Sequence, residues 1–357
     1  MIRSIRQSDV LSAAGNTARR ALHSTRTPWL LGAGVALAAM GAYVQYRTRK
    51  AEQDAPPAEK FIDVDGVRLH YLERGKGQPV VLLHGNGAMA KELEISGLVD
   101  LAAENYRVIA FDRPGYGYSE RPRTQTWNPM AQAKLLHRAL LQLGIEQPVV
   151  VGHSWATMVA ISLALQHPEY VRGLLLLSGY YYPTARLDVP LFSLPALPVI
   201  GGLMRYTAAP LLGRLVWPAM VRKLFAPADT PQRFHAEYPV WLGLRPVPLR
   251  AAAEEVALMI PSAYKLVKRY RELKMPVTIM AGADDLHVLP KLHSERLHQE
   301  LPQSELILVP AVGHMIQHTA PEKVLEALDR MASTVAWQES GRGAVATYPD
   351  SEARQVH

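Results

Sequence analysis

The sequence has no cysteine among its 357 residues, which excludes disulfide bonds, a thiolate nucleophile and cysteine metal sites. An excess of charge is also missing from most of the chain. The formal net charge is +7, but residues 1–50 hold eight of the 39 Lys and Arg and only one of the 32 Asp and Glu. The remainder is neutral and lacks the basic surface that a nucleic acid requires. No nucleic-acid partner is therefore expected.

Long hydrophobic runs are almost absent, with one exception near the N-terminus. Residues 28–46 contain no charged residue and would rise about 28 Å as a helix, which is close to the thickness of a bilayer core. Trp29 and Tyr46 lie near the ends of this run, as interfacial aromatics do, and basic residues follow it. The run predicts a single-pass membrane anchor after a basic arm, residues 1–27. The alternative is an exported protein with a signal peptide cleaved after the small residues 36–38.

The rest of the chain divides by composition into four parts. Residues 47–60 are charged and contain proline, which is typical of a short exposed linker. Residues 61–179 and 263–332 form the expected core, and residues 180–262, where no buried strand is recognisable, form an inserted helical cap. Residues 333–357 lack hydrophobic periodicity, and we expect a disordered tail there.

The apolar runs of the core are short and continuous, as in strands that are buried on both faces of a parallel sheet. Segments of helical period, such as 130–144 and 321–332, lie between them. Asp65-Gly66 predicts a tight hairpin turn at the start of the core. The sequence thus indicates an α/β fold with a mostly parallel sheet flanked by helices. The expected buried strands are 79–83, 106–111, 148–152, 173–178, 276–282 and 305–310.

The most specific motif is Gly152-His153-Ser154-Trp155-Ala156, which follows an apolar strand and runs directly into a helical pattern. A sharp strand-to-helix turn of this kind, a nucleophile elbow, projects the serine hydroxyl from the sheet beside a helix N-terminus. Gly152 leaves room for the turn, whereas Ala156 replaces the usual second glycine. Ser154 is therefore the candidate nucleophile.

Two further segments supply a base and an acid. His314 lies directly after the last expected strand, where an imidazole can reach over the sheet edge. Asp284 and Asp285 follow the preceding strand, and either carboxylate there can orient the imidazole and stabilise its protonated form. His318 lies four residues after His314, but without a glutamate partner the pair does not indicate a metal site.

Residues 61–332 resemble the α/β-hydrolase fold family over their whole length. The resemblance is carried by LLHGNG at 82–87, by FDRPGYGYSERP at 111–122, by the elbow, and by the spacing from a G-x-x-D motif to a Gly-His pair. The family's G-x-x-D pattern falls on Gly282 and Asp285, which favours Asp285 over Asp284 as the acid.

The resemblance also implies an oxyanion hole, formed by the backbone N–H groups of Asn86 and Trp155. An asparagine and a tryptophan at these positions further resemble haloalkane dehalogenases, which bind halide through the two side chains. Those enzymes use an aspartate nucleophile, which Ser154 does not provide, and the same argument disfavours an epoxide hydrolase. We therefore expect Asn86 and Trp155 to line an acyl pocket.

These features together predict a serine hydrolase that cleaves an ester, or a thioester or amide, through an acyl-serine intermediate without a cofactor. The cap is unusually apolar for an insertion, so the expected substrate is a small apolar ester or a lipid-like molecule. One alternative is a cofactor-free hydrolase of carbon–carbon bonds with the same three residues. Another is a non-catalytic, membrane-anchored binding protein.

Overall fold

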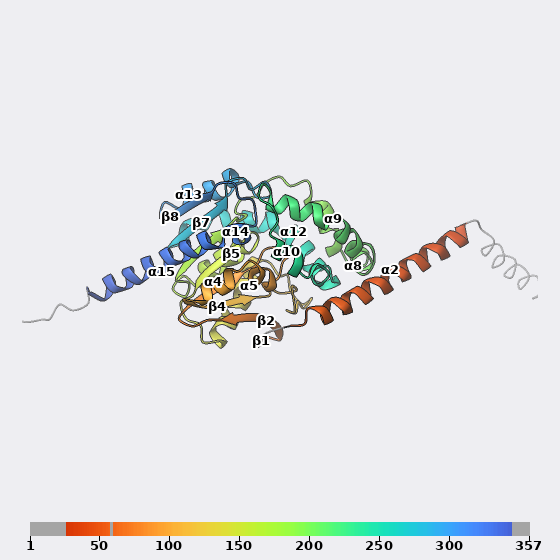
Figure 1. Cartoon of the computed structure of the whole chain (residues 1–357), viewed down its shortest axis with the longest axis horizontal. Coiled ribbons are helices and arrows are strands. Elements are labelled where there is room, and N and C mark those ends of the chain that lie inside the picture. Colours follow the sequence, from red (N-terminus) through yellow and green to blue (C-terminus); the bar gives the residue numbers. More distant parts are fainter. Residues whose placement is uncertain (1–25, 58–59, 345–357) are drawn as a thin grey trace, which may run out of the picture.

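The computed structural model describes residues 26–57 and 60–344 and is built around one eight-stranded sheet (Figure 1). The strands are β1 Lys60–Val64, β2 Val67–Arg74, β3 Gln78–Leu83, β4 Tyr106–Phe111, β5 Val149–His153, β6 Gly173–Leu177, β7 Val277–Gly282 and β8 Ser304–Val309. Their order in the sheet is β1-β2-β4-β3-β5-β6-β7-β8. The pairs that involve β2 are antiparallel, and all others are parallel. This arrangement confirms the predicted α/β fold and its mostly parallel sheet.

Helices cover both faces of the sheet because successive residues of each buried strand point to opposite sides. The helices that accompany the sheet are α3 Ala90–Ile95, α4 Leu98–Ala103, α5 Pro129–Gln142, α6 Ala156–Gln166, α13 Ser294–Glu300, α14 Ile316–Thr319 and α15 Pro321–Ala344, with short 3₁₀ turns η2 Tyr270–Glu272 and η3 Pro290–Leu292. Val81 and Leu83 pack in the cluster that contains α5, α6 and α13, whereas Val80 and Leu82 pack in the cluster that contains α3, α4 and α15.

Each of the six expected buried strands matches one of β3 to β8 to within one residue at either end. The hairpin between β1 and β2 is also where the sequence indicated. Asp65 and Gly66 have φ angles of 51° and 76°, the left-handed values that a tight two-residue turn requires.

The segment between β6 and η2 is helical and lies to one side of the sheet (Figure 1). Its elements are α7 Val189–Ser193, η1 Leu194–Ala196, α8 Ile200–Tyr206, α9 Ala208–Phe225, α10 Gln232–Glu237, α11 Val240–Gly243 and α12 Pro246–Val267. The expected boundary between residues 262 and 263 falls inside α12, because Ala263 and Leu266 at the end of this helix pack into the main core. α12 thus belongs to both the cap and the core.

The N-terminal apolar run lies in a longer helix, α2 Arg26–Asp54 (Figure 1). Among the described residues, α2 is the helix that is long and apolar enough to cross a membrane. The bent pair of α7–η1 and α8 reaches that length and hydropathy only if its two parts are counted as one span. The predicted linker is wrong for residues 47–54, which continue the helix. Ala51 is buried, Glu52 pairs with Arg245 at 2.7 Å, and the helix ends before Pro56.

The C-terminal helix α15 is also longer than expected. It runs to Ala344, so the prediction of disorder from residue 333 is wrong for residues 333–344. No proline interrupts this stretch, and Gly341 lowers helix propensity without blocking the helix. The predicted basic arm lies outside the described residues except for its last two, Arg26 and Thr27, which begin α2. The rest of the predicted tail also lies outside them.

Candidate active site

Ser154 lies at a sharp turn between β5 and α6 at the carboxyl edge of the sheet. Its φ angle is 55°, and its backbone N–H donates to the Leu177 carbonyl at 2.8 Å, which fixes the turn to the neighbouring strand β6. A side chain at Gly152 would place Cβ 2.9 Å from the carbonyl oxygen of Ala156, so glycine is required there. Ala156 itself is fully buried at the start of α6, and its methyl group does not prevent the turn.

A chain of two hydrogen bonds joins Ser154, His314 and Asp285. His314 Nε2 lies 2.9 Å from Ser154 Oγ, and His314 Nδ1 lies 2.7 Å from Asp285 Oδ2. The His314 side chain is 4% exposed and the Asp285 side chain is fully buried, so water does not compete for these contacts. The structure therefore brings together the three side chains that the sequence selected.

The other oxygen of Asp285 accepts two backbone amides, from His287 at 2.7 Å and Val288 at 2.9 Å. Burial alone would raise the pKa of this carboxyl, but His314 and the two amides outweigh burial and hold the pKa below its usual value. Asp285 is thus held as an anion that can fix the His314 tautomer. Asp284 is exposed and accepts the amide of Ala311 instead, at 3.0 Å.

The backbone of the loop between β3 and α3 approaches Ser154 closely. A Cβ atom at Gly85 would lie 3.2 Å from Ser154 Cβ, which places the following amide, that of Asn86, beside the serine. The amide of Trp155 follows the serine directly. Neither amide donates to a backbone acceptor within the described part of the chain. Both are available to an oxygen atom next to Ser154.

The side chains of Asn86 and Trp155 are directed to the cap helix α12. Trp155 Nε1 donates to the Glu255 carbonyl, and Asn86 Nδ2 contacts Glu255 Oε2 and the Ala252 carbonyl, each at 3.1 Å. These donors are therefore occupied by the protein, although the sequence indicated side chains that line an acyl pocket. The same contacts remove the two N–H groups with which a dehalogenase would hold a halide.

Glu255 and Arg113 form a buried ion pair that sequence reasoning did not find. Both side chains are 0% exposed, and Arg113 Nη1 lies 2.5 Å from Glu255 Oε1. Arg113 also donates to the carbonyls of His84 and Gly85, at 2.8 and 2.9 Å. Burial by itself would raise the pKa of Glu255, but Arg113 outweighs it and the pKa is lowered. The pair links α12 to the loop that precedes Asn86, and no local pattern couples residues 142 positions apart.

Two other histidines near Ser154, His84 and His153, have structural partners. His84 Nδ1 contacts the Gly85 carbonyl at 2.8 Å, and His153 Nε2 contacts the His314 carbonyl at 3.0 Å. Burial lowers the pKa of each to about 4, so both are neutral near pH 7. His318 Nε2 lies 2.5 Å from Glu92 Oε1, whereas His314 contacts Ser154 and Asp285, so the i, i+4 histidine pair does not converge on one ligand.

Comparison with known proteins agrees with the fold. Residues 78–321 match the sequence model of the alpha/beta hydrolase fold family, and the chain belongs to that family. It is 26% identical over 288 residues to haloalkane dehalogenase 2 of Mycobacterium tuberculosis, covering 76% of this chain and 94% of the relative. It is 33% identical over 137 residues to 2-hydroxy-6-oxo-6-(2'-aminophenyl)hexa-2,4-dienoic acid hydrolase of Metapseudomonas resinovorans, which covers 36% of this chain and 47% of that enzyme.

Among solved structures, the Cif epoxide hydrolase of Acinetobacter nosocomialis has a TM-score of 0.66 and 20% sequence identity, covering 82% of this chain and 96% of that one. This likeness shows the fold. The family membership and the relatives together identify a hydrolase of the α/β-hydrolase superfamily. They include enzymes that act on different bonds, so the bond has to be argued from the site.

Proposed function

We propose that this hydrolase cleaves a carboxylic ester through an acyl-Ser154 intermediate. The observation that carries the proposal is the hydrogen-bonded chain from Ser154 Oγ through His314 to the ionised Asp285. His314 takes the Ser154 proton as Oγ attacks the ester carbonyl, and the oxyanion accepts the amides of Asn86 and Trp155. The alcohol leaves with the proton from His314, and water then releases the acid by the same steps. A thioester or amide would follow the same route.

The identity of the nucleophile argues against dehalogenation and epoxide opening. A carboxylate that displaces halide or opens an epoxide forms an ester, which water can cleave to renew the enzyme. A serine oxygen would form an ether at the same carbon, and the ether has no carbonyl for water to attack. Ser154 therefore supports turnover only on a substrate with an acyl group, which separates this chain from the dehalogenase that it resembles.

We further propose that the substrate is a small apolar ester or a lipid-like molecule, and that α2 is a single-pass membrane anchor. The cap is rich in apolar side chains, and the first half of α2 exposes Trp29, Leu30 and Val35 to the surroundings. Cleavage of a signal peptide near residues 36–38 would remove only the exposed part of α2. Val44 and Ala51, which follow the cleavage site, are buried and would stay with the folded body. Resistance of the full chain to alkaline carbonate extraction, with residues 1–38 still present by mass, would support the anchor; release of a shortened chain would refute it.

The first test of the function is hydrolysis of p-nitrophenyl esters of increasing acyl length by the full chain in detergent, with Ser154→Ala as the comparison. Turnover should fall by several orders of magnitude in the Ser154→Ala variant, and a fluorophosphonate should label the natural chain but not this variant. Ser119→Ala is a matched control, because Ser119 Oγ bonds the Asp112 carbonyl and should not react. A folded natural chain that neither reacts nor hydrolyses any ester would favour the non-catalytic binding protein.

A second candidate is a carbon–carbon bond hydrolase with the same three residues. It is favoured by the 33% identity to the Metapseudomonas dienoic acid hydrolase over 137 residues, although the match spans less than half of either chain. A ring-cleavage dienone offered beside the esters separates the two activities. Faster turnover of the dienone, abolished in Ser154→Ala, would replace the ester proposal.

A further inference from the structure

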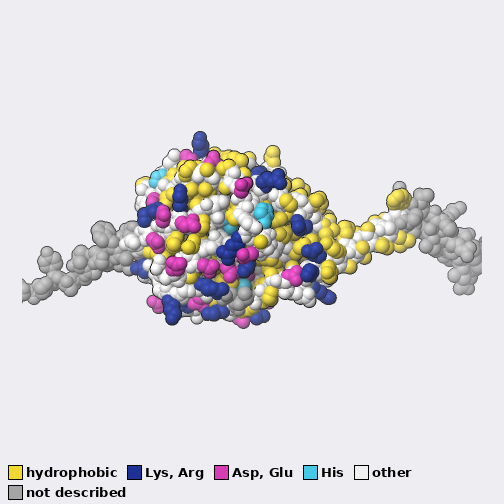
Figure 2. All heavy atoms as spheres, viewed as in Figure 1, with side chains coloured by type: hydrophobic (Ala, Val, Ile, Leu, Met, Phe, Trp, Pro, Cys, Tyr) yellow, Lys and Arg dark blue, Asp and Glu magenta, His cyan; other side chains and the backbone are white. Residues whose placement is uncertain are grey.

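The cap carries a large apolar surface on its outer helices. In Figure 2 hydrophobic side chains gather over the cap and continue onto α2. An exposed patch of this extent marks a site of association with a membrane or another apolar partner. We call it the cap face. Its exposed residues, from the segment before α7 through α9, are Leu187, Leu191, Phe192, Leu197, Val199, Ile200, Leu203, Tyr206, Leu212, Leu215, Val216 and Met220.

The cap face adjoins α2, which is divided into a free part and a packed part. Trp29 and Val35 are 82% and 71% exposed, whereas Val44 and Ala51 are 2% and 7% exposed. The packed part begins near Gly41, where an added Cβ would lie 3.7 Å from the Tyr206 carbonyl of α8. From there α2 runs along α8, α9 and α11. The last third of the proposed anchor, residues 41–46, therefore lies against the folded body.

Because the end of the apolar run lies against the folded body, the depth of α2 in a membrane also determines the depth of the cap. The apolar residues that precede Gly41, 28–40, rise only about 20 Å, whereas the hydrocarbon core is about 30 Å thick. The missing length, roughly 10 Å, has to come from residues 41–46, in which Gly41 and the buried Val44 already lie against the folded body. If α2 crosses the bilayer, the cap helices beside it must enter the bilayer too. The cap would have to enter the bilayer by roughly 10 Å, the length that residues 28–40 do not supply. This depth agrees with the ~5–10 Å at which apolar helix faces lie in a membrane interface.

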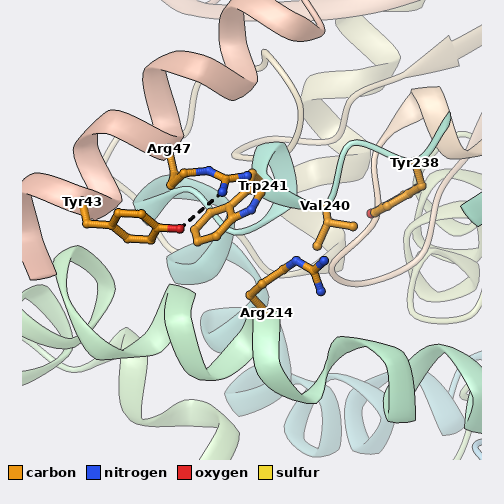
Figure 3. Close-up of a pocket in the computed structure, with 6 residues that line it drawn as sticks. All are labelled: Tyr43, Arg47, Arg214, Tyr238, Val240 and Trp241. Atoms are coloured by element: carbon orange, nitrogen blue, oxygen red, sulfur yellow. Dashed lines mark hydrogen bonds between the residues drawn. The ribbon is translucent and has the colours of Figure 1, made fainter. Parts of the chain in front are cut away.

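The charges beside the packed part of α2 suit the headgroup level. Arg47 and Arg214 line a pocket of about 480 Å³ between α2 and the cap, together with Tyr43, Tyr238, Val240 and Trp241 (Figure 3). The Arg47 guanidinium lies 4.4 Å from the Trp241 ring centroid, and its Nη1 contacts the Tyr43 hydroxyl at 3.3 Å. The described residues of this lining include two guanidinium groups and no carboxylate, which favours a phosphate, and tryptophan and tyrosine are typical of the membrane interface.

We propose that the cap face docks into the bilayer that α2 crosses, with anionic lipid phosphates at Arg47 and Arg214. The inference rests on the proposed anchor and gives the proposed hydrolase a source of substrate, a lipid ester delivered from the membrane. α9 connects the two regions. Its outer side carries Leu215, while the Leu224 carbonyl at its end accepts the backbone N–H of His314 at 3.0 Å. A backbone hydrogen bond thus connects α9, which carries part of the cap face, to the loop that holds His314, the proposed base.

Because the chain has no cysteine, single cysteines report on single positions. An environment-sensitive fluorophore is attached at Val199→Cys or Leu215→Cys on the cap face, at Val35→Cys on the free part of α2, and at Leu141→Cys on α5, which is 53% exposed on the core. The labelled full chains are reconstituted into vesicles of phosphatidylcholine and phosphatidylglycerol that contain spin-labelled lipid. Quenching measures contact with the bilayer.

We expect strong quenching at Val35, Val199 and Leu215 and little at Leu141. If the label at Val35 is quenched but both cap labels are quenched no more than the label at Leu141, the docking is overturned and the anchor stands. An unquenched Val35 would overturn the anchor and the inference with it. Neither outcome bears on ester hydrolysis, which the Ser154→Ala comparison tests separately.

The two arginines are tested with the double substitution Arg47→Gln and Arg214→Gln. Each arginine near an anionic surface should favour docking about fivefold, so the docked-to-undocked ratio should fall roughly 30-fold in anionic vesicles and stay unchanged in pure phosphatidylcholine. Lys134→Gln on α5 is the matched control and should change neither ratio. Equal quenching by the double variant and the natural chain in anionic vesicles would overturn the phosphate contacts.

Discussion

Replacing Glu255 with glutamine removes the negative member of a fully buried ion pair. The carboxylate accepts two bonds from Arg113, at 2.5 and 3.1 Å, and further bonds from Gln132, Tyr116 and Asn86. Glutamine keeps the shape but leaves the Arg113 charge unneutralised away from water. A buried pair broken on one side costs about 3–5 kcal/mol. That is a large share of the 5–15 kcal/mol by which domains are typically stable.

The same substitution should lower activity, because Arg113 holds the His84 and Gly85 carbonyls just before the Asn86 amide. A shift of the proposed oxyanion donor by about 1 Å should reduce kcat by about 10²-fold with esters. Replacing both Arg113 and Glu255 with methionine removes both charges. This double variant should be more stable than Glu255→Gln.

The assay is urea unfolding of the full chain in detergent, followed by tryptophan fluorescence, with ester hydrolysis measured on the same samples. Glu254→Gln is the matched control. Glu254 neighbours Glu255 on α12, but its side chain is 30% exposed and pairs with Arg121 at 2.7 Å, so its loss should cost about 1 kcal/mol. If Glu255→Gln destabilises the chain no more than Glu254→Gln, the assignment of a buried charge pair that joins cap and core is wrong.

Asp285→Asn should reduce kcat by up to about 10⁴-fold because the His314 tautomer is lost, whereas Asp284→Asn should stay near the natural rate; similar losses in both would refute the choice of acid. Acid should destabilise the fold, since folding lowers the pKa of His84 and His153 from 6.5 to about 4 and the unfolded chain binds more protons between these values. The stability that these two histidines contribute is fully present above pH 6.5. It should fall by about 2 kcal/mol per histidine at pH 5. Urea unfolding at pH 7 and pH 5 measures this loss, which His84→Gln should reduce; equal stability at both pH values would contradict it.

Much of the fold and of the candidate site could be predicted from local sequence. The short apolar runs correspond to β3 to β8, because a strand buried on both faces needs apolar residues at every position. The turn at Asp65-Gly66 and the elbow at Ser154 depend on backbone angles that a few neighbouring residues determine. Parallel strands also end at one edge of the sheet, so Ser154, Asp285 and His314 were expected to meet.

Tertiary structure alone decided the features that depend on distant partners. Arg113 reads as a turn residue and Glu255 as one of two glutamates on a helix. Only the packing of α12 against the loops that follow β3 and β4 buries them as a pair. Residues 47–54 read as a charged linker, yet they continue α2 because Ala51 and Glu52 find contacts on the cap. The apolar cap sequence left open which side chains face outward. A local pattern fixes backbone preference and periodicity, whereas burial and charge pairing depend on which segments the folded chain brings together.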